Sequence, residues 1–111
     1  MPNQPLPGIQ QFDLTGKAAV VTGGAKGLGL AMAAGLASAG ADLLLVNRNA
    51  AEGQAAADQL AADFNVRAHA FAADVTRQEE AEAMTARAVE LFGKIDILIN
   101  SAGINIRGPI D

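Results

Sequence analysis

Cysteine, tryptophan and tyrosine are absent from the 111 residues, and histidine occurs once. Without cysteine no disulfide framework can form, and one histidine cannot build a Cys/His metal cluster, so we expect no metal site. The lack of cysteine also fits a cytoplasmic protein. No apolar run reaches the roughly 18 residues of a membrane-spanning helix. The formal net charge of −4 argues against a nucleic-acid partner. We therefore expect neither a membrane nor a nucleic-acid partner.

The start of the chain differs in composition from the rest. The segment MPNQPLPGIQQF carries three prolines. It lacks the positive region followed by an apolar region that marks a secretory signal peptide. We interpret residues 1–13 as a flexible N-terminal arm. Residues 14–111 are expected to form one unit, because a chain of this length is too short for two domains.

Short apolar runs recur along the chain and predict β-strands. Three of the four are nearly continuous in apolar residues rather than alternating, which is typical of strands covered on both faces. The four predicted strands are residues 17–22 (KAAVVT), 41–47 (ADLLLVN), 66–75 (VRAHAFAADV) and 94–100 (KIDILIN).

Helical patterns lie between these strands. The first, over residues 28–39, is rich in alanine and is followed by a glycine that suits a helix C-terminus. The second follows a capping box of Asn49 and Glu52, and the third follows a similar box of Thr76 and Glu79. The apolar positions at three- or four-residue steps in these two helices are Leu60, Phe64, Ala81, Met84, Ala88 and Leu91. The glycines expected to end the first and third helices are Gly40 and Gly93.

Strand and helix therefore alternate as β-α-β-α-β-α-β. Strand starts recur about every 25 residues, which leaves room for a helical crossover and predicts a parallel sheet. The connections should be right-handed. The predicted fold class is α/β, a Rossmann-type three-layer parallel sheet with strand order 3-2-1-4.

A glycine-rich loop joins the first predicted strand to the first predicted helix. In VVTGGAKGLGLAMA, the glycines Gly23, Gly27 and Gly29 have the spacing G-x-x-x-G-x-G. Such glycines permit a close approach of ligand to backbone, and the following helix N-terminus favours a phosphate. A P-loop would need lysine and then serine or threonine after the last glycine, where this chain has leucine and alanine. The common spacing G-x-G-x-x-G would need a glycine at Met32.

The observed spacing, in this strand-to-helix setting, resembles the cofactor loop of the short-chain dehydrogenase/reductase family. Asp74-Val75, at the end of the third predicted strand, is similar to that family's adenine-contacting aspartate. NSAG, residues 100–103, is similar to its Asn-Asn-Ala-Gly motif. The resemblance covers nearly all of the chain after the arm and implies a bound nicotinamide dinucleotide. The residues implied to bind it are Thr22, Gly23, Gly24, Lys26, Gly27, Leu28, Gly29, Asn47, Arg48, Asp74, Val75, Asn100, Ser101, Ala102 and Gly103.

The same resemblance implies roles for some of these residues. Gly23, Gly27 and Gly29 would make room for the pyrophosphate. Asn100 would tie neighbouring strand ends together rather than catalyse. Ser101 is not expected to be a nucleophile, because no histidine base is near it. The lone histidine, in the third predicted strand, is interpreted as a surface or edge residue without a role.

The end of the second predicted strand, LLLVNRN, bears on which nicotinamide cofactor is used. A carboxylate here binds the ribose 2′-hydroxyl of NAD, whereas an arginine accommodates the 2′-phosphate of NADP. Asn47 stands where the acid would, Arg48 follows, and Lys26 lies in the glycine loop. In the resembled family a basic residue at either place goes with NADP. We therefore predict NADP; the alternatives are NAD, and that both cations are merely solvated.

The residues that catalyse the reaction in the resembled family are missing from these 111 residues. They are a serine, a Tyr-x-x-x-Lys pair and an asparagine on a later helix, and this chain contains no tyrosine. The resemblance thus implies the truncated, cofactor-binding half of an oxidoreductase, inactive alone. Its full-length parent would transfer hydride between nicotinamide and a carbonyl or secondary alcohol, and only that parent would bind the substrate. The overall run looks most like enzymes acting on sugar acids such as gluconate, and next like 3-oxoacyl-carrier-protein reductases.

Other interpretations stay open at this point. A non-catalytic nucleotide-binding or assembly module would use the same half of the fold. A flavodoxin-like or phosphoacceptor domain shares the alternation, but a phosphoacceptor would need clustered acids where the first strand ends VVTGG. The fourth predicted strand presents an apolar edge, IDILIN, which invites pairing with another chain. We therefore also expect a homo-oligomer.

Overall fold

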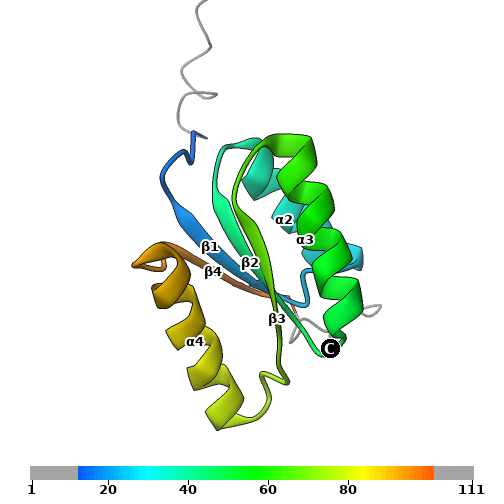
Figure 1. Cartoon of the computed structure of the whole chain (residues 1–111), viewed down its shortest axis with the longest axis vertical. Coiled ribbons are helices and arrows are strands. Elements are labelled where there is room, and N and C mark those ends of the chain that lie inside the picture. Colours follow the sequence, from blue (N-terminus) through cyan, green and yellow to red (C-terminus); the bar gives the residue numbers. More distant parts are fainter. Residues whose placement is uncertain (1–12, 102–111) are drawn as a thin grey trace, which may run out of the picture.

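The computed structural model of the chain describes residues 13–101, in which four parallel strands form one sheet with the order β3-β2-β1-β4 (Figure 1). The strands are β1 (Ala18–Thr22), β2 (Asp42–Asn47), β3 (Ala68–Ala72) and β4 (Ile97–Asn100). The helices are α2 (Gly27–Ser38), α3 (Ala50–Phe64) and α4 (Gln78–Phe92). The predicted Rossmann-type fold and strand order are confirmed. Residues 1–12 of the predicted arm lie outside the described residues, as do Ala102 and Gly103.

The helices cover the two faces of the sheet, with α2 and α3 on one face and α4 on the other (Figure 1). Successive strand residues point to opposite faces. Val21 and Leu45, which are in register, pack in the core beneath α2 and α3. Their neighbours Val20 and Leu44 pack on the other face, with Met84 of α4. Both central strands are therefore buried on both faces, which explains their nearly continuous apolar sequences.

All four strands are shorter than predicted, β1 and β2 by one residue each and β3 and β4 by more. β3 ends at Ala72 rather than at residue 75, because the chain turns at Asp74, whose carbonyl accepts a hydrogen bond from the Arg77 N–H at 3.1 Å. β4 begins at Ile97 rather than at residue 94. The residues between Ala72 and α4 are thus a loop at the carboxyl end of the sheet, where a ligand site would lie.

The ends of the first two helices follow the predicted signals. Gly40 follows Ala39, the C-cap of α2, with a positive φ of 103°, and its N–H donates to the Ala37 carbonyl at 2.9 Å. Asn49 caps α3, and its side chain accepts a hydrogen bond from the Glu52 N–H at 3.0 Å. Only this half of the predicted capping box forms among residues 13–101, because the Glu52 carboxylate lies beside Lys26 instead. Gly93 likewise ends α4 with a φ of 79°.

Among the helices of residues 13–101, none is long and apolar enough to cross a membrane.

The predicted capping box of Thr76 and Glu79 is wrong. The cap position of α4 is taken by Arg77, whose side chain makes no cap hydrogen bond. Thr76 instead donates from its hydroxyl to Asp74 Oδ1 at 2.6 Å. The Glu80 carboxylate, rather than that of Glu79, reaches back and accepts from the Asp74 N–H at 2.7 Å. The Thr76 hydroxyl therefore bonds to Asp74 within a local turn rather than to the N–H groups at the start of α4.

His69 lies on β3, at the edge of the described sheet, which agrees with its interpretation as an edge residue. Its ring is 6.0 Å from that of Phe92, at the end of α4. The Arg67 guanidinium lies 5.1 Å from the centre of the Phe92 ring, in a cation–π contact. Arg67 also donates from Nη2 to Asp42 Oδ2 at 2.8 Å. These contacts join the start of β3 to β2 and to α4, which gives His69 a packing role.

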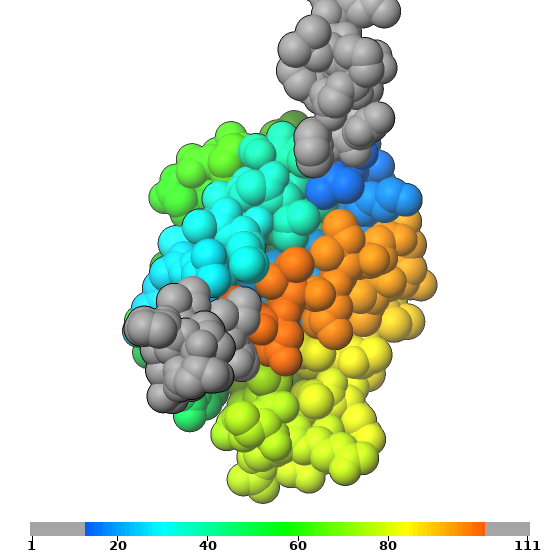
Figure 2. All heavy atoms as spheres, turned by 180° about the vertical axis from the view of Figure 1, so that it is seen from behind, coloured from blue at the N-terminus to red at the C-terminus, as the bar shows by residue number. Residues whose placement is uncertain are grey.

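β4 forms the other edge of the described sheet and is less covered than its neighbour β1. Leu98 is 57% exposed, whereas Val20, its register partner on β1, is fully buried. Figure 2 shows the atoms of β4 (orange) at the surface beside α2 (cyan). The apolar edge expected from the sequence is therefore present.

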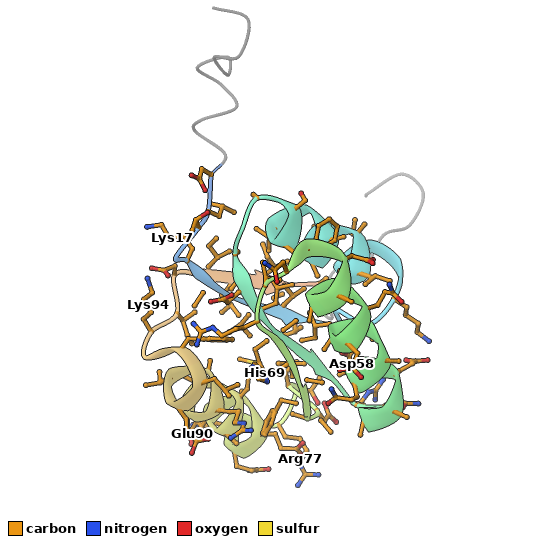
Figure 3. All side chains as sticks on the ribbon, turned by 45° about the horizontal axis from the view of Figure 1, so that its top comes forward. Lys17, Asp58, His69, Arg77, Glu90 and Lys94 are labelled. Atoms are coloured by element: carbon orange, nitrogen blue, oxygen red, sulfur yellow. The ribbon has the colours of Figure 1, made fainter. Side chains whose placement is uncertain are left out.

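Asp96 joins the amino ends of β1 and β4. The Ala18 N–H donates to its Oδ2 at 2.8 Å, and Lys94 Nζ lies 3.1 Å from the same oxygen. Figure 3 shows Lys94 and Lys17 at this end of the sheet. The hydrogen bond from Ala18, followed by that from Lys94, lowers the pKa of the Asp96 carboxyl from its ordinary value. The ionised carboxylate therefore stabilises the pairing of these two strands.

We expect Asp96→Ala to lower the urea midpoint of unfolding at about pH 7, because the Ala18 N–H loses its acceptor. A carboxyl whose folded pKa is lowered adds stability above its unfolded pKa of about 3.9 and loses it as the pH falls through the folded value. The difference in urea midpoint between the wild type and Asp96→Ala should therefore shrink in acid. Asp96→Asn keeps an oxygen acceptor without the charge, so at about pH 7 its urea midpoint should lie between those of the wild type and Asp96→Ala. A gap that is absent at neutral pH, or that does not change with pH, would contradict this account.

Candidate functional site

A crevice of about 460 Å³ lies at the carboxyl ends of β1, β2 and β3. In open parallel sheets, ligands bind outside the carboxyl ends of the strands. Four segments line the crevice: the glycine loop, the end of β2, the first turn of α3 and the loop after β3. The predicted site residues that the structure brings together in its lining are Gly23, Lys26, Asn47, Arg48, Asp74 and Val75.

The remaining predicted site residues do not line this crevice. Those within the described part of the chain belong to the glycine loop and its surroundings or end β4: Thr22, Gly24, Gly27, Leu28, Gly29, Asn100 and Ser101. Sequence reasoning missed five lining residues: Val46, Asn49, Glu52, Ala73 and Thr76. From the sequence, Asn49, Glu52 and Thr76 are interpreted only as helix-capping residues. The signal that could have found all five is their place at, or within five residues after, the carboxyl ends of β2 and β3.

Side chains tie the carboxyl ends of β1 and β4 together. Thr22 is 2% exposed and donates from its hydroxyl to Asn100 Oδ1 at 2.8 Å. Ser101 donates from its hydroxyl to the Thr22 carbonyl oxygen. Asn100 thus has the strand-tying role that the family resemblance implies. The Ser101 hydroxyl is engaged with backbone, which agrees with the prediction that it is not a nucleophile.

The glycines of the loop serve different purposes. Gly23 and Gly27 have positive φ values of 69° and 63°, which side chains rarely adopt. A Cβ on Gly27 would meet nothing within 4 Å, so this glycine borders open space. A Cβ on Gly29 would lie 2.7 Å from the Gly23 carbonyl carbon and 2.5 Å from Ser101 Oγ. Gly29 therefore allows α2 to approach β1 and β4 closely, and its part in making room for a phosphate stays a prediction.

Asp74 borders the crevice as an ionised carboxylate. Its Oδ1 accepts hydrogen bonds from the Thr76 hydroxyl at 2.6 Å and from the Thr76 N–H at 3.0 Å. These bonds are the main cause that lowers the pKa of Asp74, and the positive charges of Arg48 and Arg77 lower it further. The turn therefore holds the carboxylate in one orientation beside the crevice.

Two cations and a second acid complete the charge pattern of the crevice. Lys26 Nζ, in the glycine loop, lies 3.8 Å from Glu52 Oε2, in the first turn of α3. Arg48 lies between β2 and α3 and lines the same crevice. Asn47 Oδ1 is buried and has no hydrogen-bond partner among the described residues. The end of β2 thus contributes an amide and a guanidinium, but no carboxylate.

The comparisons with known proteins agree on one kind of relative. Residues 17–111 match the model of a family described as short chain dehydrogenase. An uncharacterized oxidoreductase from Mycobacterium tuberculosis is 43% identical over 95 residues, which are 86% of this chain and 36% of that protein. Gluconate 5-dehydrogenase from Gluconobacter oxydans is 40% identical over 100 residues, which are 90% of this chain and 39% of that protein.

A solved structure agrees with these relatives. The crystal structure of L-sorbose reductase from Gluconobacter frateurii, complexed with NADPH and L-sorbose, has a TM-score of 0.81 and 38% identity to this chain. The match covers 89% of this chain and 38% of the reductase chain. The chain therefore spans less than two-fifths of the length of these relatives.

Gly29→Ala tests the close contact between α2 and the strand ends. The added Cβ must displace the backbone of Gly23, and we expect the free energy of unfolding to fall by about 1–3 kcal/mol. Gly35→Ala, in the same helix, is the matched control: a Cβ there meets nothing within 4 Å. This control should raise the free energy of unfolding by about 0.5–1 kcal/mol. Both are measured by urea unfolding, and equal stability of Gly29→Ala and wild type would refute the packing role.

Proposed function

The chain belongs to the short-chain dehydrogenase family, and from this membership we propose that it forms the cofactor-binding part of an NADP-dependent oxidoreductase. The observation that carries the proposal is the crevice at the carboxyl ends of β1 to β3. It brings the glycine loop beside two cations, Lys26 and Arg48. A site of this composition suits a phosphorylated ligand.

The N-terminus of α2 fits the pyrophosphate of such a cofactor. This helix begins at Gly27 and has neither a side-chain cap nor an acidic residue in its first turn. By contrast, α3 is capped by Asn49, and both α3 and α4 carry glutamate in their first turn. The positive end of α2 is thus left uncompensated by the helix itself, and Gly27 leaves open space beside it. Gly23, Gly24, Leu28 and Gly29 complete the loop in this proposal.

The other site residues divide between the two ends of the cofactor. Asp74 and Val75 would contact the adenine, whereas Lys26, Asn47 and Arg48 would hold the 2′-phosphate. Thr22, Asn100 and Ser101, with Ala102 and Gly103 beyond the described residues, would border the nicotinamide. When bound, the nicotinamide supplies the hydride acceptor or donor of the reaction. The residues of this chain bind and orient it.

For the whole protein we propose a carbonyl or secondary alcohol as substrate, of the sugar or sugar-acid kind. Two relatives support this class by name, gluconate 5-dehydrogenase and L-sorbose reductase. The 111 residues contain no tyrosine, the general acid/base that the family resemblance implies. We therefore propose that this chain binds the cofactor without turning over substrate.

Arg48→Asp tests the choice of cofactor. In the wild type we expect NADPH to bind more tightly than NADH, because Arg48 offers charge-assisted hydrogen bonds to the 2′-phosphate. The variant should lose at least about ten-fold in NADPH affinity, since a hydrogen bond to a charged group contributes about 1.5–3 kcal/mol. Its NADH affinity should not fall, so that the preference reverses. Calorimetric titration measures both dissociation constants.

Arg87→Asp is the matched control, because Arg87 lies on α4 outside the crevice lining and undergoes the same change of charge. It should keep the wild-type preference. Tighter binding of NADH than of NADPH by the wild type would contradict the assignment of NADP as the cofactor.

We also propose that the chain self-associates through β4, whose Leu98 is 57% exposed at the edge of the described sheet. Leu98→Lys places a charge at this edge, which disfavours strand pairing between chains. In light scattering, the wild type should exceed the monomer mass and Leu98→Lys should approach it. Val89→Lys, at an exposed apolar position on α4, should behave as the wild type. A wild type that stays monomeric at all concentrations would contradict the proposal.

A further inference from the structure

The two cations of the crevice differ in their surroundings. Lys26 Nζ lies 3.8 Å from Glu52 Oε2. Arg48 takes part in none of the ion pairs found within residues 13–101. An anion entering the crevice therefore meets Arg48 outside any ion pair, although near the Asp74 carboxylate, and it meets Lys26 already associated with Glu52.

Glu52 owes its position to the cap of α3, but its carboxylate does not serve that cap. The Glu52 N–H donates to Asn49 Oδ1 at 3.0 Å. In a full capping box the Asn49 N–H would also donate a hydrogen bond to the Glu52 carboxylate. That bond is missing from the hydrogen bonds of residues 13–101, and the carboxylate lies beside Lys26 instead. The backbone of Glu52 thus holds the helix end, and its side chain is left to act on the crevice.

We propose that Glu52 is a specificity-determining residue that competes with the cofactor's 2′-phosphate for Lys26. The proposal rests on the proposed function, and it goes beyond it by assigning a role to an acid that the NADP assignment does not use. The Glu52 carboxylate opposes a phosphorylated ribose in two ways: it occupies Lys26, and it repels a second anion nearby. An unphosphorylated ribose meets neither obstacle.

The exposure of the pair indicates that Glu52 tunes the preference rather than blocks the site. The side chains of Lys26 and Glu52 are 78% and 44% exposed. Ion pairs in water are weak and are readily exchanged for a better partner. A phosphate dianion is such a partner for lysine. The wild type therefore binds NADPH, but less tightly than the same crevice would without the Glu52 charge.

Glu52→Gln tests this inference, because it removes the charge and keeps the backbone N–H that Asn49 caps. We expect NADPH affinity to rise about three- to ten-fold, the combined effect of freeing Lys26 and removing the repulsion. NADH affinity should change by less than about two-fold, because its ribose carries no phosphate. Glu90→Gln is the matched control: Glu90 lies on α4, outside the crevice lining (Figure 3), and pairs with Arg87. It should leave both affinities unchanged.

A double-mutant cycle with Lys26→Gln separates competition from simple repulsion. If Glu52 acts through Lys26, the gain in NADPH affinity from Glu52→Gln should shrink markedly in the Lys26→Gln background. A gain of the same size in both backgrounds would overturn the competition for Lys26. An unchanged NADPH-to-NADH ratio in Glu52→Gln, with Arg48→Asp still reversing the preference, would overturn this inference and leave the proposed function intact. Failure of the wild type to bind either dinucleotide would overturn both.

Discussion

The close approach of α2 to the ends of β1 and β4 is the constraint on which the rest of the site depends. Gly29 brings the first turn of α2 against the backbone of Gly23 and the hydroxyl of Ser101. Thr22 and Asn100 join the same strand ends by a side-chain hydrogen bond. Because these contacts fix where α2 begins, they also fix where its positive end points. A glycine that seems to serve the ligand therefore serves the scaffold that presents the ligand site.

The crevice follows from that placement. Once α2 is fixed, the loop before it faces the end of β2, the first turn of α3 and the turn at Asp74. Each segment brings one charge: Lys26, Arg48, Glu52 and Asp74. The two cations would attract a phosphorylated ligand, and the two carboxylates limit how strongly they do so. Selectivity in such a site is the difference between the affinities for NADPH and NADH. A single acid in the crevice lining, such as Glu52, is able to shift that difference.

The sequence predicted the sheet correctly because the signals of β1 and β2 are local and strong. Each has four consecutive apolar residues, 18–21 and 43–46, and each closely follows a glycine. Parallel pairing then leaves few possible orders. It failed at α4, where Thr76 had two partners within reach and sequence spacing could not decide between Asp74 and the helix N–H groups. It also missed Glu52 as part of the crevice. Which way a capping side chain points depends on a residue far along the chain, here Lys26.

Backbone amide shifts of the isotope-labelled chain during an NADPH titration test the central claim most directly. The account predicts that the largest changes fall on Gly23, Gly27 and Arg48, at the carboxyl ends of the strands. The amino ends, near Lys17 and Lys94 (Figure 3), should be unaffected. Changes confined to those amino ends, or no changes at saturating NADPH, would contradict a cofactor site in this crevice.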